Sequence, residues 1–211
     1  MEAIKSYRPE SNSLSTGQVL HCAYPAKKAA LAAREMADLL VLDLVKKRLV
    51  TDQIVLTIGY VIDNLIDPVR LATYQGAVSI DHYGRKIPKH AHGCVHLAEY
   101  TASSQVILPA FDQLYHQIAD PNLLVRRLTI TANHIIPENA VSSGDGIQLD
   151  LFSGANEGCG HMAETRREQK RQRTILEIQS KYGKNALLKG MNLEDGAMTI
   201  IRNAQIGGHK A

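Results

Sequence analysis

Cysteine is scarce in this chain of 211 residues, and long apolar runs are missing. The three cysteines, Cys22, Cys94 and Cys159, are an odd and widely spaced set, which favours a reducing compartment over a disulfide framework. No apolar run approaches the roughly 18 residues that a membrane-spanning helix needs. The start MEAIKSYRPE also lacks the apolar core of a secretory signal. We therefore expect a soluble cytoplasmic protein that makes no membrane contact.

Signatures of common enzymes are missing as well. We find no glycine-rich phosphate loop and no pairing of a nucleophile with a base. The net charge of +3 is too small to diagnose nucleic-acid binding, so the distribution of charge matters more. From His161 onward the sequence contains ten basic and five acidic residues, which gives the tail a net charge of +5 and the rest of the chain a net charge of −2.

The apolar pattern predicts one core, for which 211 residues with 45% hydrophobic content are sufficient. A helix from Pro25 to Arg48 carries one apolar stripe at spacings of three and four. The helix that begins near Ser103 contains Pro109, which should kink or delay it. Strands are expected at 17–24, 53–61, 94–97 and 125–132.

The connection at 63–93 is long for a compact domain, which suggests that it has a role of its own. Its segment YQGAVSIDHYG is able to pair as a β-ribbon.

These elements follow one another in the order β-α-β-β-α-β, which predicts an α+β fold. We expect a four-stranded, mostly antiparallel sheet with both helices on one face. The other face would then be open, and alternation along the strands places small hydroxyls and a guanidinium there. Such groups suit phosphate contacts. The residues concerned are Thr57, Arg127, Thr129 and Thr131.

A short peptide, Gln148-Leu149-Asp150-Leu151-Phe152, lies in a segment rich in Gly, Ser and Asn. Leucine and phenylalanine exposed in such a segment are natural anchors for an apolar pocket on a partner. The alternative is that the peptide folds back on its own domain. The pentapeptide resembles the consensus by which bacterial DNA polymerases and repair proteins bind the sliding clamp.

The resemblance extends over nearly the whole chain. The segments SNSLSTGQVL, VRRLTITANHI, QLDLF, KYGKNALLKGMNL and RNAQIGGHKA together resemble the C-terminal third of Y-family translesion DNA polymerases of the UmuC-like (ImpB/MucB/SamB) branch. In that family this region is the little finger, a β-α-β-β-α-β domain that binds DNA near the lesion, followed by a clamp-binding tail.

The resemblance implies four segments. Residues 1–16 would be a linker from a missing catalytic core, 17–139 the little finger, 140–160 a flexible linker with the clamp peptide, and 161–211 a basic helical tail. The helix expected from Met162 to Tyr182 suits a solvated helix, a DNA-tracking arm or a site for another replication or recombination protein.

Family polymerases hold magnesium on three converging carboxylates of another domain. No acidic residue of this chain lies in a comparable motif, so we expect no catalytic residue, metal site or cofactor here, with magnesium implied only for the missing core.

Sequence-independent contacts with a primer–template duplex are expected from basic and hydroxyl side chains, because these groups bind phosphates without reading bases. The candidates are Arg126, Arg127, Thr129, Thr131, Lys86, Lys89, Ser13, Ser15 and Thr16.

Alternating His90, His92, Cys94 and His96 also suggest zinc. Neighbouring residues on one side of a strand are about 7 Å apart, so four of them converge poorly on one tetrahedral ion. The simpler interpretation is that they are polar side chains on the DNA-facing side of the sheet.

Two hypotheses follow. The first is an accessory module of a translesion polymerase, acting in DNA repair, that binds DNA and tethers the enzyme to the clamp. The second is a free-standing, non-enzymatic adaptor that binds the clamp and DNA.

Overall fold

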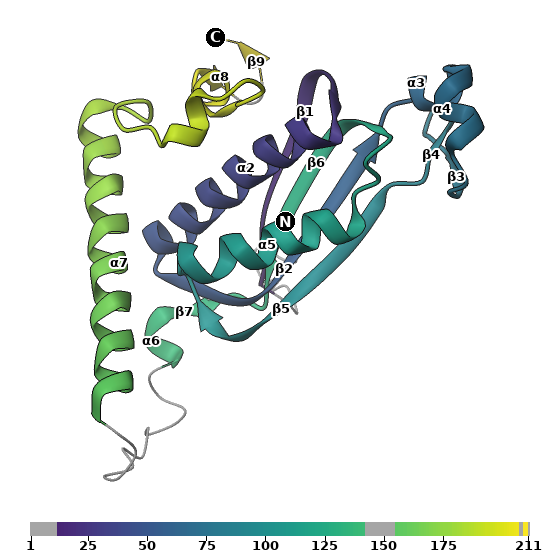
Figure 1. Ribbon diagram of the computed structural model, residues 1–211. Helices are drawn as coiled ribbons and strands as arrows, with labels where there is room; N and C mark the ends of the chain where they lie inside the picture. Colours follow the sequence, from purple (N-terminus) through teal and green to yellow (C-terminus); the bar gives the residue numbers. More distant parts are fainter. Residues whose placement is uncertain (1–11, 142–154, 207–208, 211) are drawn as a thin grey trace, which may run out of the picture.

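The computed structural model describes residues 12–141, 155–206 and 209–210. Its main sheet is antiparallel, with the long strands in the order β1 (Leu14–Pro25), β6 (Leu124–Asn133), β2 (Leu49–Tyr60) and β5 (Ala91–Thr101). The helices α2 (Ala26–Lys47) and α5 (Ser104–Ile118) lie side by side on one face of this sheet (Figure 1). The α+β class, the helix positions and the order of the main elements are therefore confirmed.

The sheet has five strands rather than the four expected. The additional strand β7 (Ile136–Pro137) pairs with the start of β2, with Leu49 opposite Pro137 and Val50 opposite Ile136. It follows β6 after a kink at His134, where φ is 51°. A strand of two residues that includes proline leaves no periodic pattern, which explains why it was not predicted.

Alternation along the strands separates the two faces of the sheet as expected. In β2, Ile54, Leu56 and Ile58 are buried, whereas Val55 and Thr57 between them are only half-buried. The buried set packs against α2 and α5. Its central side chain is Phe111 of α5, which is fully buried. Removing this apolar surface from water is the main stabilising contribution to the fold.

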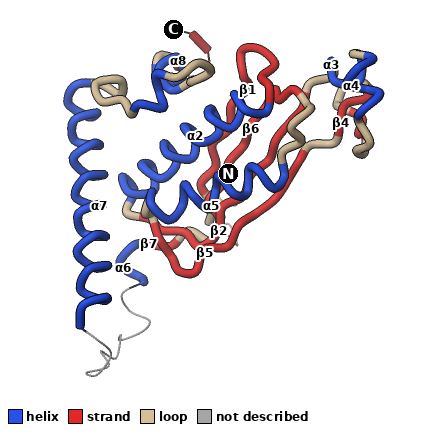
Figure 2. The backbone as a smooth tube through the Cα atoms, in the orientation of Figure 1, coloured by secondary structure: helices blue, strands red, loops and turns tan. Residues whose placement is uncertain are grey.

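The connection between β2 and β5 folds into a small lobe. It contains α3 (Asp63–Ile66), α4 (Pro68–Thr73) and the two-stranded ribbon of β3 (Val78–Ile80) and β4 (Lys86–Pro88). A ribbon was predicted within 74–84, but only its first strand lies there, because β3 pairs with β4 at Lys86–Pro88. The two short helices were not predicted. The lobe projects beyond the end of the main sheet, at the upper right of Figures 1 and 2.

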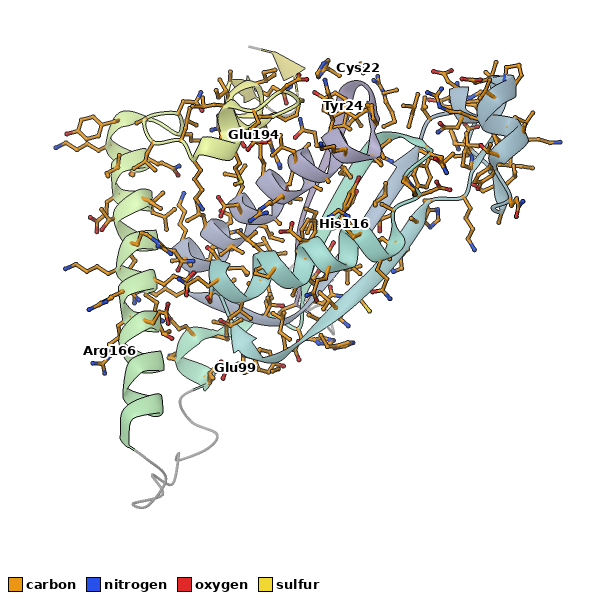
Figure 3. All side chains as sticks on the ribbon, viewed as in Figure 1. Cys22, Tyr24, Glu99, His116, Arg166 and Glu194 are labelled. Carbon is orange, nitrogen blue, oxygen red and sulfur yellow. The ribbon has the colours of Figure 1, made fainter. Side chains whose placement is uncertain are left out.

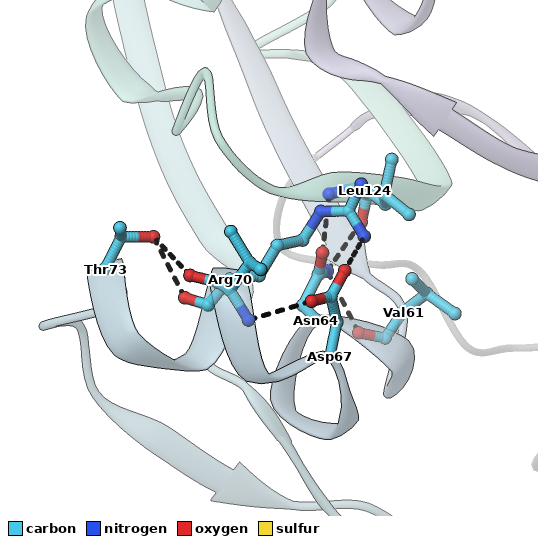
Figure 4. Close-up of polar contacts among 7 residues, drawn as sticks. Val61, Asn64, Asp67, Arg70, Thr73 and Leu124 are labelled. Carbon is cyan, nitrogen blue, oxygen red and sulfur yellow. Dashed lines mark hydrogen bonds and ion pairs between the residues drawn. The ribbon is translucent and has the colours of Figure 1, made fainter.

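Buried Asn64 anchors this lobe to the sheet (Figure 4). Its side-chain amide donates to the carbonyl oxygens of Val61 and Leu124 at 3.0 and 2.9 Å, and its carbonyl oxygen accepts from the Leu124 N–H at 2.8 Å. An asparagine can satisfy all three backbone groups at once because it carries both donors and an acceptor. Asp67 then begins α4 by accepting from the Val69 N–H at 2.9 Å.

The charged tail packs against the domain. The helix α7 (Ala155–Tyr182) begins earlier than the predicted Met162 and stands beside α2 (Figure 1). After it come a short 3₁₀ turn, η1 (Gly190–Leu193), the helix α8 (Thr199–Asn203), and the paired strands β8 (Gln205–Ile206) and β9 (His209–Lys210). The remaining short helix, α6 (Glu138–Val141), follows β7.

Carboxylate and amide side chains of α7 join it to the start of α5. Buried Glu168 accepts from the Ser103 hydroxyl at 2.5 Å and from the Gln105 N–H at 3.1 Å. One turn further on, Gln172 donates to the Ala102 carbonyl and the Ser104 hydroxyl, both at 3.0 Å. The Glu168 carboxylate thus satisfies a free N–H at the start of α5, where the Ser103 side chain makes no capping bond. Within the described residues, no helix is long and apolar enough to cross a membrane.

Candidate nucleic-acid interface

The sheet face opposite α2 and α5 is built from rows of small polar residues. In the middle row, Thr129 of β6 lies between Gly17 of β1 and Thr57 of β2. On its other side, Thr57 lies opposite His92 of β5. Directly opposed residues of antiparallel strands point to the same side of a sheet. All four strands therefore contribute to one row.

The neighbouring row begins with Ser15 of β1 and Thr131 of β6 and continues to Val55 and Cys94. The Thr131 hydroxyl donates to the Ser15 hydroxyl at 3.0 Å. The structure thus places Thr57, Thr129 and Thr131 on one face, as the alternation predicts. Ser15 joins them because it lies opposite Thr131.

A cationic row follows, in which Arg127 lies between Val19 of β1 and Gly59 of β2. Arg127 is exposed. A Cβ atom at position 59 would lie only 3.1 Å from the Cβ of Arg127, so the glycine leaves room for that side chain. Arg126 is the extra residue of a β-bulge, because Gly59 and Tyr60 pair with Arg127 and Val125.

Side chains on this face hydrogen-bond to one another in a chain across the strands. Asn133 donates to Gln53 Oε1 at 2.9 Å, and Gln53 Nε2 contacts His96 Nε2 at 3.1 Å. Thr57 Oγ1 contacts His92 Nδ1 at 2.9 Å. Sequence reasoning did not identify Gln53 and Asn133 as part of the face, although the same alternation along β2 and β6 indicates them.

The zinc interpretation receives no geometric support from these partners. His92 and His96 each pair with a side chain of β2 rather than with each other. In the part of the chain that the structure describes, no three histidine, cysteine, aspartate or glutamate residues lie close enough to hold a metal ion.

Other candidate residues lie elsewhere. Thr16 lies opposite Ile130, on the helix-covered side of the sheet, where its hydroxyl accepts a hydrogen bond from Arg202. Thr16 therefore lies on the other side of the sheet from Ser15, because the two are neighbours in the alternation. Its DNA contact stays a prediction. Ser13 is exposed just before β1.

The two lysine candidates, Lys86 and Lys89, are exposed on the projecting lobe rather than within the rows of the open face. The clamp-peptide candidates Gln148, Leu149, Asp150, Leu151 and Phe152 lie outside the described residues.

The basic residues of α7 form a separate surface. Arg166 points away from the domain (Figure 3), and the neighbouring basic side chains of this helix are also exposed. They are Arg167, Lys170, Arg171, Arg173 and Lys181.

The arrangement of the open face can bind anions without chemical change: it offers the cation of Arg127, four hydroxyls and several amide or imidazole groups on an antiparallel surface. No protein-family model and no curated protein matches this chain.

Proposed function

We propose that the chain is a DNA-binding module that lays the open face of its sheet against a primer–template duplex. The observation that carries this proposal is the set of rows in which Ser15, Thr129, Thr131 and Thr57 lie beside Arg127. Hydroxyl groups and a guanidinium bind phosphate oxygens and set the position of a protein on DNA without reading its bases.

The shape of this face also supports the proposal. The core-forming helices α2 and α5 lie on the opposite side of the sheet, so the rows are open to a large partner (Figure 1). Apart from Val19 and Val55, the side chains of the rows are polar, sulfur-containing or absent. A hydrated polar surface of this kind suits the wet, polar character of protein–DNA interfaces.

A second contact, with the sliding clamp, forms part of the proposal because of the peptide from Gln148 to Phe152. Its two leucines and phenylalanine would fill an apolar pocket of the clamp, and its glutamine would add directional hydrogen bonds. With both contacts, the chain would act as the accessory module of a Y-family translesion polymerase. This module would bind the duplex and tether the polymerase to the sliding clamp.

Fluorescence anisotropy with a labelled primer–template duplex tests the DNA contact. Arg127→Ala should weaken binding to duplexes of different sequence by equal factors. It should also reduce the magnitude of the slope of log K against log salt concentration by about 1. Lys27→Ala is the matched control, because Lys27 is exposed on α2, on the other side of the sheet. Equal effects of the two substitutions, or none from Arg127→Ala, would refute the proposed face.

Titration calorimetry with a purified bacterial sliding clamp tests the tether. The chain should bind, and the double substitution Leu151→Ala/Phe152→Ala should abolish binding. The same variant should keep its affinity for duplex DNA, which separates the two contacts. Undiminished clamp binding by the variant would show that the pentapeptide is not the contact.

A further inference from the structure

A groove of about 1250 Å³ follows the outer edge of β1. Five consecutive residues of that strand, from Ser15 to Val19, line one side of it. The other sides are formed by α2, by the second half of α7, by the tail around Arg202 and Gln205, and by Arg127 and Thr129 of β6. Since consecutive strand residues point to opposite faces of a sheet, a groove lined by all five follows the edge of the strand rather than one face.

Among the described residues, β1 is the terminal strand of the sheet and pairs only with β6. Along Ser15–Val19, the backbone groups that point away from β6 have no protein partner among the described residues. A row of free N–H and C=O groups along an edge strand is a template for the addition of another strand. The groove therefore offers hydrogen bonds to an extended backbone over about 16 Å, at roughly 3.3 Å per residue.

Both charged and apolar side chains line the groove. Six basic residues line it against two acidic ones, Asp43 and Glu177, and Asp43 is already bonded to Lys47 at 3.4 Å. The basic residues are Lys46, Arg48, Arg127, Arg173, Lys184 and Arg202. The lining also includes aliphatic side chains from both helices, among them Leu39, Leu42 and Leu176. This surface complements acidic and aliphatic side chains.

Two buried polar atoms in the groove wall have no partner in the described structure. They are the side-chain oxygen of Gln18 and one terminal nitrogen of the Arg202 guanidinium. Burial lowers the pKa of Arg202, because desolvation penalises its charged form. Buried groups without partners are rare and costly, so the groove wall around these two residues is less well satisfied than the rest of the core.

We propose that this groove binds an extended acidic peptide of a partner protein, which adds to the edge of β1 as a further strand. Its carboxylates would face Lys46, Lys184 and Arg202, and its aliphatic side chains would contact the leucines of α2 and α7. Of the residues that the structure describes, no aromatic one lines the groove, whereas sites for single-stranded nucleic acid typically stack bases on aromatic rings. A peptide therefore fits the lining better than a nucleic acid.

The probe for the test is a fluorescein-labelled peptide in which aspartate alternates with leucine. Its binding to the full chain is measured by anisotropy, without DNA, so the result does not depend on the proposed DNA contact. One control peptide carries lysine in place of aspartate, and another is N-methylated at alternate amides, which removes the donors needed for strand addition. Both control peptides should bind at least about tenfold more weakly than the aspartate peptide.

Charge-reversal variants locate the site. Lys46→Glu/Lys184→Glu should weaken binding of the aspartate peptide by about tenfold or more. The matched control, Lys27→Glu/Lys181→Glu, makes the same charge change on or beside the same two helices but outside the groove, and it should bind normally. Hydrogen exchange of the Ser15–Val19 amides should slow when the peptide is bound.

Three outcomes would overturn the proposal. The first is equal binding of the N-methylated peptide, and the second is equal loss of affinity in both charge-reversal variants. The third is that an oligothymidylate, but not the peptide, protects the β1 amides, which would assign the groove to single-stranded DNA.

Discussion

The carboxylate of Glu35, in the middle of α2, accepts a hydrogen bond from the side-chain amide of Asn192 at 2.7 Å. The same carboxylate accepts from the backbone N–H groups of Met198 and Thr199, at 2.5 and 3.4 Å. Glu35 is only 2% exposed. A buried carboxylate needs such donors, and here all of them come from the tail. One turn away, Asp38 pairs with Lys189 at 2.6 Å.

Glu35→Ala should therefore destabilise the whole domain. The substitution removes the only acceptor that the structure shows for the Met198 N–H and leaves several buried donors without a partner. We expect a loss of about 2–4 kcal/mol in the free energy of unfolding, measured by urea denaturation. The exposed Glu194→Ala serves as control and should change stability by less than about 0.5 kcal/mol. A loss no larger than that of the control would show that the tail is not held through Glu35.

Glu168→Ala should release α7 from α5 with less effect on the core. Its carboxylate accepts from both the Ser103 hydroxyl and the Gln105 N–H, and hydrogen bonds to a charged group contribute about 1.5–3 kcal/mol. Hydrogen exchange should become faster in 164–182 while the β2 and β6 amides stay protected. The matched control is Glu164→Ala, one turn earlier on the exposed face. Equally slow exchange in both variants would contradict this account.

Gly93→Ala should destabilise the packing of β5 against α5. A Cβ atom at this position would lie 2.8 Å from Cγ2 of Ile118 and 3.0 Å from Cδ1 of Leu114, so both side chains have to move. We expect a cost of about 1–2 kcal/mol in thermal or urea unfolding. Gly17→Ala is the control on the open face, where the new Cβ would lie 3.4 Å from the Thr129 hydroxyl oxygen. Gly17→Ala should be neutral or slightly stabilising. A larger loss of stability for Gly17→Ala than for Gly93→Ala would contradict the prediction.

The ribbon of β3 and β4 should loosen in acid. Hydrogen bonds from the Arg85 side chain and backbone hold the pKa of Asp81 below its ordinary value, and the Tyr83 N–H contributes to the same effect. A lowered carboxyl pKa stabilises the ribbon above the pKa of the unfolded chain, about 3.9, and this contribution is lost as the pH falls through the folded value. Amide chemical shifts of Val78–Ile87 measured between pH 6 and pH 2 should report the change.

Asp81→Asn provides the control for that titration. The variant cannot ionise at position 81, so the acid-range shift of the ribbon amides should disappear. An unchanged acid transition in the variant would assign the titration to another group.

Patterns in the sequence were sufficient for the main elements. The helix predicted from Pro25 to Arg48 is α2, and Arg48 ends it with φ at 54°. The helix near Ser103 forms despite Pro109, which lies inside α5 with an exposed side chain. The predicted open face is confirmed as one surface for Thr57, Thr129 and Thr131, because a period of two follows directly from strand geometry. Its DNA contact stays a prediction.

The prediction of a single buried stripe on α2 was wrong. Twelve residues of this helix are buried, including Glu35 and Asp38, which a helical pattern places toward solvent. Periodicity reports one face that packs on the sheet, but it carries no information about a second surface that covers the opposite side. That surface is the tail, whose contacts with α2 bridge more than 150 residues of sequence.

The sequence by itself determined where the two core helices and the four long strands lie and which strand residues share a face, because these depend on local periodicity and backbone geometry. Only the tertiary structure decided that the charged tail packs on α2 and α5 and that a groove follows the edge of β1. Both depend on partners distant in the sequence: the carboxylates of Glu35 and Glu168 are buried only because donors from other segments satisfy them.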